Sequence, residues 1–330
     1  MRHRINLPLI AVVLGLVLPL AIGELLLRSM PVSDALLAQP VSDETPVFRF
    51  AANRTLTWSK GWNFAIINQV RVNNYGYVND HDYRPSDKSS LLAVLGDSYV
   101  EAARVPYAKT LHGRLAKMFQ GAGRVYSFGA SGAALSQYLA WAEFARRTFA
   151  PQKLIFVIIA NDFDESLLKR KQGPGFHYFD TDRDGAERLV RVDHEPSLLR
   201  AIARRSALIR YLVLNLGIER AWSRVKNLFS GGVGRSEAVS MVGNVPADRP
   251  ASLIADAQRA VGMFFRMLPA SAGLSPPDIL FVVDGLRPAV YSETGLERAK
   301  SSYFGRLRRH FIDQARRRGY EVVDMNPIFA

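Results

Sequence analysis

Five short segments rich in apolar residues alternate with segments of helical periodicity, and this alternation constrains the fold more than any other feature of the sequence. Apolar runs of this length are typical of strands buried on both faces of a parallel sheet. The helical segments between them supply the crossovers that parallel strands need. The pattern predicts an α/β fold with a doubly wound, five-stranded parallel sheet. The five expected strands are Leu91–Leu95, Arg124–Ser127, Lys153–Ala160, Ile279–Asp284 and Tyr320–Met325.

Polar or glycine residues follow the first three of these strands. Gly96–Ser98 comes directly after the first strand, Gly129–Gly132 after the second, and Asn161 after the third. In an open α/β sheet the ligand crevice lies just outside the carboxyl ends of the strands, so Ser98 is a candidate nucleophile. Backbone N–H groups beside glycines and an asparagine amide suit the stabilisation of an oxyanion. The alternatives are that Asp97 or Ser98 caps the next helix, that the glycine turn binds phosphate, and that Asn161 only ends its strand.

The amino-acid composition excludes several kinds of catalytic and binding site. The 330 residues include no cysteine, which excludes disulfides, thiolate metal sites and a cysteine nucleophile. The net charge of +13 favours anionic partners such as a membrane surface. No zinc-binding spacing, phosphate-binding loop or nucleic-acid-binding motif accompanies this charge. We therefore expect no nucleic acid as a partner, no metal and no cofactor.

The N-terminal segment has the charge pattern of an export or membrane signal. Basic residues at positions 2–4 precede the run Leu7–Gly23, which contains no charged residue. With Leu25–Leu27 the apolar character extends to about the ~20 residues that span a bilayer. We predict an uncleaved transmembrane helix within residues 1–30; the alternatives are a signal peptide cleaved near Ala21–Gly23 and a buried soluble helix. With either a transmembrane helix or a signal peptide, the rest of the chain is expected to lie outside the cytoplasm, in the periplasm or at the cell exterior.

The remaining chain divides into a connecting part and a large domain. Residues 31–90 are expected to form a linker and a small β-rich excursion, and residues 91–330 the α/β domain, interrupted by an insertion over residues 164–250. Within the insertion, Ser197–Phe229 is a long helical stretch with many arginines and one acidic residue. This stretch either lies on an anionic membrane surface or caps the main sheet.

Three short motifs follow the first three expected strands: Gly96–Tyr99, Gly129–Gly132 and Ala160–Asp162. In this order they resemble three sequence blocks of the SGNH (GDSL-like) hydrolases. The resemblance implies a flavodoxin-like, three-layer fold and activity on esters or transferable acyl groups. It implies that Ser98 is the nucleophile, and that the N–H groups of Ser98 and Gly132 and the Asn161 side chain form the oxyanion hole. Ala160 departs from the glycine that is usual before the asparagine.

The family's general base is the part of the pattern that this sequence lacks. The family carries Asp and His in a last block after the fifth strand, but here the sequence ends at Ala330, soon after that strand, and His310 falls inside a basic helix. We expect no histidine within hydrogen-bonding reach of Ser98, in either a truncated hydrolase or an inactive relative. The other histidines considered are His81, His112, His177 and His194.

The sequence therefore predicts an extracytoplasmic serine esterase or O-acyltransferase, with acylated envelope glycans or acylated small molecules as the substrate class and the membrane as a partner. The alternative is a catalytically inactive binding or scaffold module of the same fold.

Overall fold

The computed structural model describes residues 7–119, 121, 123–218, 241–286, 297 and 299–329. The chain divides into two compact units. We call the unit of Met1–Leu37, Thr55–Val70 and Pro196–Gly234 the N-terminal unit. We call the unit of Ala38–Arg54, Arg71–Glu195 and Arg235–Ala330 the α/β unit.

A five-stranded parallel sheet forms the centre of the α/β unit, as predicted. Its strand order is β11-β10-β5-β3-β4, so the first strand of the sheet lies between the second and the third. This is the flavodoxin-like order, which creates a crevice at the carboxyl ends where the chain changes direction across the sheet. The strands are β3 (Leu91–Gly96), β4 (Arg124–Gly129), β5 (Lys153–Ile158), β10 (Ile279–Val283) and β11 (Glu321–Asp324).

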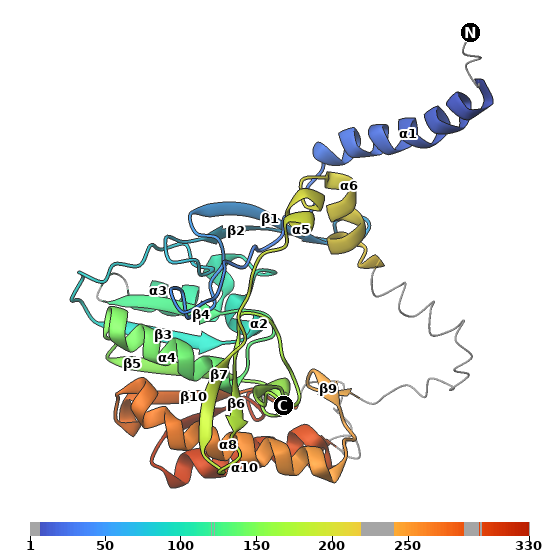
Figure 1. Ribbon diagram of the computed structural model, residues 1–330. Coiled ribbons are helices and arrows are strands. Elements are labelled where there is room, and N and C mark those ends of the chain that lie inside the picture. Colours follow the sequence, from blue (N-terminus) through green and yellow to red (C-terminus); the bar gives the residue numbers. More distant parts are fainter. Residues whose placement is uncertain are drawn as a thin grey trace. The chain divides into compact units, whose positions relative to one another are not determined.

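Helices pack on both faces of this sheet (Figure 1). Because side chains alternate along a strand, Val94 and Val157 face one side, where Leu115 of α3 packs against their cluster. Phe156 faces the opposite side and contacts Phe264 of α8 edge to face, with ring centroids 5.7 Å apart. The helices are α3 (Leu111–Phe119), α4 (Leu135–Phe149), α8 (Ala251–Ala272) and α10 (Tyr303–Arg317).

Shorter elements complete the α/β unit. Two antiparallel pairs, β6 with β7 and β8 with β9, stand apart from the main sheet. Their bounds are β6 (His177–Thr181), β7 (Glu187–Arg191), β8 (Met241–Val242) and β9 (Val245–Pro246). The short helices are α2 (Ser98–Glu101), η1 (Tyr107–Lys109), η2 (Ala160–Asp162), η3 (Asp164–Ser166) and η5 (Pro276–Asp278).

The register aligns the carboxyl ends of β3, β4 and β5. Gly96, the last residue of β3, pairs with Gly129, the last residue of β4. On the other side of β3, Leu95 pairs with Phe156 of β5. The segments that follow β3, β4 and β5 therefore leave the sheet at one edge.

The N-terminal unit combines an apolar helix, a hairpin and short helices from a distant part of the chain. Asn215 accepts a hydrogen bond from the Ser33 backbone N–H at 3.0 Å and donates to Ser59 Oγ at 2.8 Å, so it joins three separate segments. The elements are α1 (Leu7–Arg28), β1 (Arg54–Lys60), β2 (Ile66–Val72), α5 (Leu198–Ala203), α6 (Ala207–Arg210) and η4 (Tyr211–Asn215).

Glu24 fastens α1 to α6. Its carboxylate accepts hydrogen bonds from Ser206 Oγ and from the backbone N–H groups of Ala207 and Leu208, at 2.8–3.0 Å. The first N–H groups of a helix lack partners within the helix, and Glu24 supplies an acceptor for them. The hydrogen bonds from Leu208, Ser206 and Ala207 lower the pKa of Glu24 from 4.5 to about 2.

The structure corrects the predicted transmembrane helix. Among the described residues, no helix is long and apolar enough to cross a membrane. Glu24 and Arg28 form an ion pair in the last turns of α1.

The long helix expected over residues 197–229 is broken where the structure describes it. α5 ends at Ala203, and Ser206 begins α6 by accepting a hydrogen bond from the Ile209 N–H. A serine side chain competes for backbone N–H groups in this way, so it favours a new helix start over continuation. Residues 219–229 lie outside the described part of the chain.

Candidate active site

Ser98 stands at the start of α2, directly beyond the carboxyl end of β3. Asp97 is buried and caps α2 by accepting the Tyr99 N–H at 2.9 Å. The Ser98 side chain is exposed, and its Oγ donates to Asp97 Oδ2 at 3.1 Å. The capping alternative raised by the sequence therefore holds for Asp97, and the Ser98 hydroxyl beside it is exposed.

A glycine in β4 allows α2 to lie close to the sheet. A Cβ atom on Gly129 would stand 2.6 Å from the Glu101 backbone nitrogen, which is too close for any side chain. Glu101, at the end of α2, accepts the Ser131 N–H at 2.5 Å through Oε2. The turn after β4 is thus fastened to the helix that begins at Ser98.

Gly132 occupies the same turn with φ at +92°, a conformation that favours glycine. Its carbonyl oxygen accepts a hydrogen bond from Lys171 Nζ at 3.0 Å. Lys171 also forms an ion pair with Glu165 Oε2. One lysine therefore ties this turn to the segment that follows β5.

Asn161 lies in η2, directly after β5, and both ends of its amide are engaged. Nδ2 donates to Glu165 Oε2 at 3.1 Å, and Oδ1 accepts from Asn244 Nδ2. Because Lys171 contacts both Glu165 and the Gly132 carbonyl, Gly132 and Asn161 belong to one hydrogen-bonded network. The roles of Ser98, Gly132 and Asn161 in catalysis remain predictions.

Buried carboxyl groups surround this edge of the sheet. Burial raises the pKa of Asp97 to about 7 and that of Asp284, which follows β10, to about 6. Burial likewise raises the pKa of Glu101 to about 7. Asp162 accepts from the Ile159 N–H and the Tyr138 hydroxyl, and burial raises its pKa well above the usual range. Burial therefore favours the protonated form of these carboxyl groups at pH values where an isolated carboxyl group is fully ionised.

Within the described residues, no histidine ring hydrogen-bonds to Ser98. His112 is buried in α3, where burial lowers its pKa to about 4. His177 Nδ1 lies 3.2 Å from Gln137 Oε1, and burial lowers its pKa to about 4 as well. His81 packs edge to face on Tyr107, with ring centroids 5.7 Å apart. His194 pairs through its backbone with Val41, and His310 lies inside α10.

No group of histidine or carboxylate side chains in the described chain is arranged to hold a metal ion. Sequence reasoning missed four residues of the network: Glu101, Glu165, Lys171 and Asn244. A weak signal existed for Glu165, which lies four residues after Asn161 in a polar segment. No such signal existed for Lys171 and Asn244, because neither residue is close in the sequence to the strand ends that form the site.

Comparison with solved structures finds similarity to a lipase and to two esterases. A GDSL-like lipase from Bacteroides thetaiotaomicron matches with 9% identity and a TM-score of 0.30, over 73% of this chain and 71% of that one. An esterase of the SGNH-hydrolase family matches with 10% identity and a TM-score of 0.31, over 72% and 76%. An acetyl xylan esterase from the rumen bacterium Butyrivibrio proteoclasticus matches with 9% identity and a TM-score of 0.31, over 74% and 57%. The sequence matches no protein-family model and no curated protein.

Proposed function

We propose that the α/β unit is a serine esterase or O-acyltransferase with Ser98 as its nucleophile. The observation that carries this proposal is the exposed Ser98 hydroxyl at the carboxyl end of the interior strand β3, hydrogen-bonded to a buried carboxyl group. A reactive serine needs exposure, a fixed position and an acceptor for its proton. Ser98 has all three.

In the proposed reaction, Ser98 Oγ attacks the carbonyl carbon of an ester, and the Oγ proton moves to an acceptor. Among the described residues Asp97 Oδ2 offers that acceptor, at 3.1 Å from Oγ. Burial raises the pKa of Asp97 to about 7, which suits a base that works near neutral pH. The alcohol leaves with a proton, and the acyl group then passes from Ser98 to water or to a second hydroxyl.

The oxyanion formed in this attack requires fixed donors. The proposed donors are the N–H groups of Ser98 and Gly132 and the Nδ2 group of Asn161. Removing one such donor typically costs about 10²–10³-fold in rate. The left-handed backbone at Gly132 and the clamped amide of Asn161 favour this assignment, because both donors are held in place before substrate arrives.

The substrate class and location are finer parts of the same proposal. We place the protein outside the cytoplasm because basic residues at positions 2–4 precede the uncharged run Leu7–Gly23. Acylated envelope glycans are the substrates that such a location offers. Fusion of alkaline phosphatase after Ala330 checks the location: activity of the reporter in intact cells supports it, and activity confined to the cytoplasm contradicts it.

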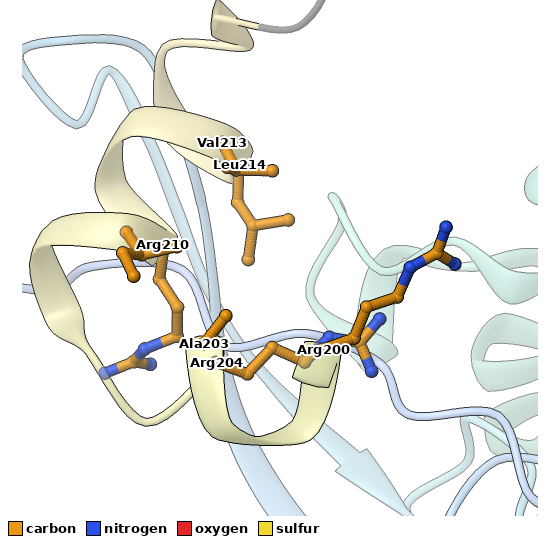
Figure 2. Close-up of a pocket in the computed structure, with 7 residues that line it drawn as sticks. Arg200, Ala203, Arg204, Arg210, Val213 and Leu214 are labelled. Carbon is orange, nitrogen blue, oxygen red and sulfur yellow. The ribbon is translucent and has the colours of Figure 1, made fainter. Parts of the chain in front are cut away.

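The N-terminal unit is proposed to contact an anionic membrane surface. Its α5 exposes 81% of Leu198, 80% of Leu199 and 63% of Ile202 to solvent. Arg200 of the same helix and Arg204, the residue directly after the helix, line a pocket of about 340 Å³ together with aliphatic side chains (Figure 2). Apolar side chains beside arginines are the combination that binds the interface of an anionic bilayer.

A catalytically inactive binding or scaffold module is the second candidate, favoured by the finding that no described histidine hydrogen-bonds to Ser98. Labelling with a fluorophosphonate probe separates the two. We expect covalent labelling of the wild type at Ser98 and none of S98A. Equal labelling of the two proteins, or none of either, would leave the inactive module.

A further inference from the structure

Lys171 and Glu165 form an ion pair that touches two of the proposed oxyanion donors. Lys171 Nζ donates to the Gly132 carbonyl at 3.0 Å and contacts Glu165 Oε2. The same Oε2 atom accepts from Asn161 Nδ2 at 3.1 Å. The side chains of the pair are only 28% and 33% exposed. This pair is therefore partly shielded from water, and it contacts two of the residues that are proposed to stabilise the oxyanion.

We propose that the Lys171–Glu165 pair positions the oxyanion hole: Glu165 sets the orientation of the Asn161 amide, while Lys171 neutralises Glu165 and anchors Gly132. The inference rests on the proposed role of Ser98 as nucleophile. Neither Lys171 nor Glu165 takes part in bond making, so both are positioning residues.

The orientation argument follows from the chemistry of the two groups. An ionised carboxylate only accepts hydrogen bonds, so the amide of Asn161 must turn Nδ2, and not Oδ1, toward Glu165. Asn244 Nδ2 donates to Asn161 Oδ1 and so engages the other end of the amide. Nδ2 carries two hydrogens, and Glu165 takes one. The second hydrogen is then held in a fixed direction for a ligand.

The negative charge of Glu165 requires a compensating positive charge, which Lys171 supplies. A carboxylate next to a developing oxyanion opposes the reaction, because like charges repel strongly where water is partly excluded. Lys171 offsets that charge and also holds the residue that supplies the Gly132 N–H. Replacing only the lysine therefore leaves the negative charge of Glu165 uncompensated, which slows the reaction. Replacing both residues removes that charge as well.

The test compares K171M, E165Q, K171R and the double variant K171M/E165Q in the full chain. The readouts are the rate constant of fluorophosphonate labelling at Ser98 and kcat and KM for p-nitrophenyl acetate. We expect K171M to lower both the labelling rate and kcat about 10–100-fold, with little change in KM. K171R should stay near wild type, and adding E165Q to K171M should restore part of the loss. Lys169 gives the matched control, because it is paired with Asp256 instead; K169M should stay within about 2-fold of wild type.

The outcomes separate this inference from the function on which it rests. If wild-type protein is not labelled at Ser98, the proposed function fails. If the wild type is labelled and K171M reacts as fast as K169M, the function stands and the positioning role is wrong. A double variant no faster than K171M would overturn the charge argument. Should K171M fail to fold, K171R and E165Q decide: equal rates overturn the inference, and a slower E165Q supports it.

Discussion

Glu101 shows how a single buried carboxyl group couples the site to pH. Its carboxylate accepts the Ser131 N–H, and burial raises its pKa from 4.5 to about 7. Between these two pKa values, Glu101 keeps a proton in the folded protein and releases it in the unfolded chain. The stabilisation from Glu101 is therefore complete below pH 4.5 and is lost as the pH rises through 7.

We predict that E101Q flattens this dependence, since Gln keeps an acceptor for the Ser131 N–H but does not titrate. Between pH 5 and pH 8 the free energy of unfolding of the wild type should fall relative to E101Q by about 2–3 kcal/mol. Urea titrations at each pH measure it. E143Q, at a partly exposed position in α4, is the control and should follow the wild type. An E101Q curve parallel to the wild type would mean that Glu101 does not titrate in this range.

At the same scale, the sequence predicts which residues follow the strands, but it does not predict which other residues form hydrogen bonds or ion pairs with them. Ser98, Gly132 and Asn161 each lie just beyond a strand, and local patterns are enough to find them. Lys171 is 39 positions along the chain from the carbonyl that it contacts. Contacts of this kind depend on how a loop returns over the sheet, and no local pattern records that.

At the scale of elements, the close approach of α2 to β4 depends on a residue without a side chain. A Cβ on Gly129 would meet the Glu101 backbone nitrogen at 2.6 Å, so α2 and Ser98 would have to move. We predict that G129A lowers the free energy of unfolding by about 1–3 kcal/mol and slows fluorophosphonate labelling. In α8 the same change should have the opposite effect: a Cβ on Gly262 meets only the flexible Arg266 side chain, so G262A should be neutral or stabilising. Equal effects of the two variants in thermal unfolding would refute this account.

Strands and helices were not equally predictable. After its first residue, Lys153, strand β5 is apolar and buried on both faces, so composition alone identifies it. The segment after Ser197 has helical composition, yet Ser206 starts a new helix whose first N–H groups bind Glu24. That partner lies more than 180 positions away, and periodicity within the segment could not reveal it.

At the scale of the whole molecule, the division into two units was not foreseen. The sequence suggested a linker over residues 31–90 and an insertion over residues 164–250. In the structure, Thr55–Val70 and Pro196–Gly234 belong to the same unit as α1. Buried polar side chains such as Asn215 hold these segments together, and a polar residue in the sequence gives no sign of which distant partner satisfies it.

The last prediction concerns how the net charge of +13 is used. Every arginine contributes equally to the net charge. If the N-terminal unit binds an anionic membrane, however, its arginines should contribute more to membrane binding than arginines elsewhere in the chain. We predict that R200Q/R204Q weakens co-sedimentation with phosphatidylglycerol vesicles about 5–30-fold, at roughly 1 kcal/mol for each arginine near the surface. R306Q/R309Q in α10 removes the same charge from exposed positions of the α/β unit and should weaken binding less than 2-fold. Because surface electrostatics is screened by salt, the difference should shrink as ionic strength rises. Equal losses in the two double variants would mean that binding follows overall charge, and the N-terminal unit would then have no special role.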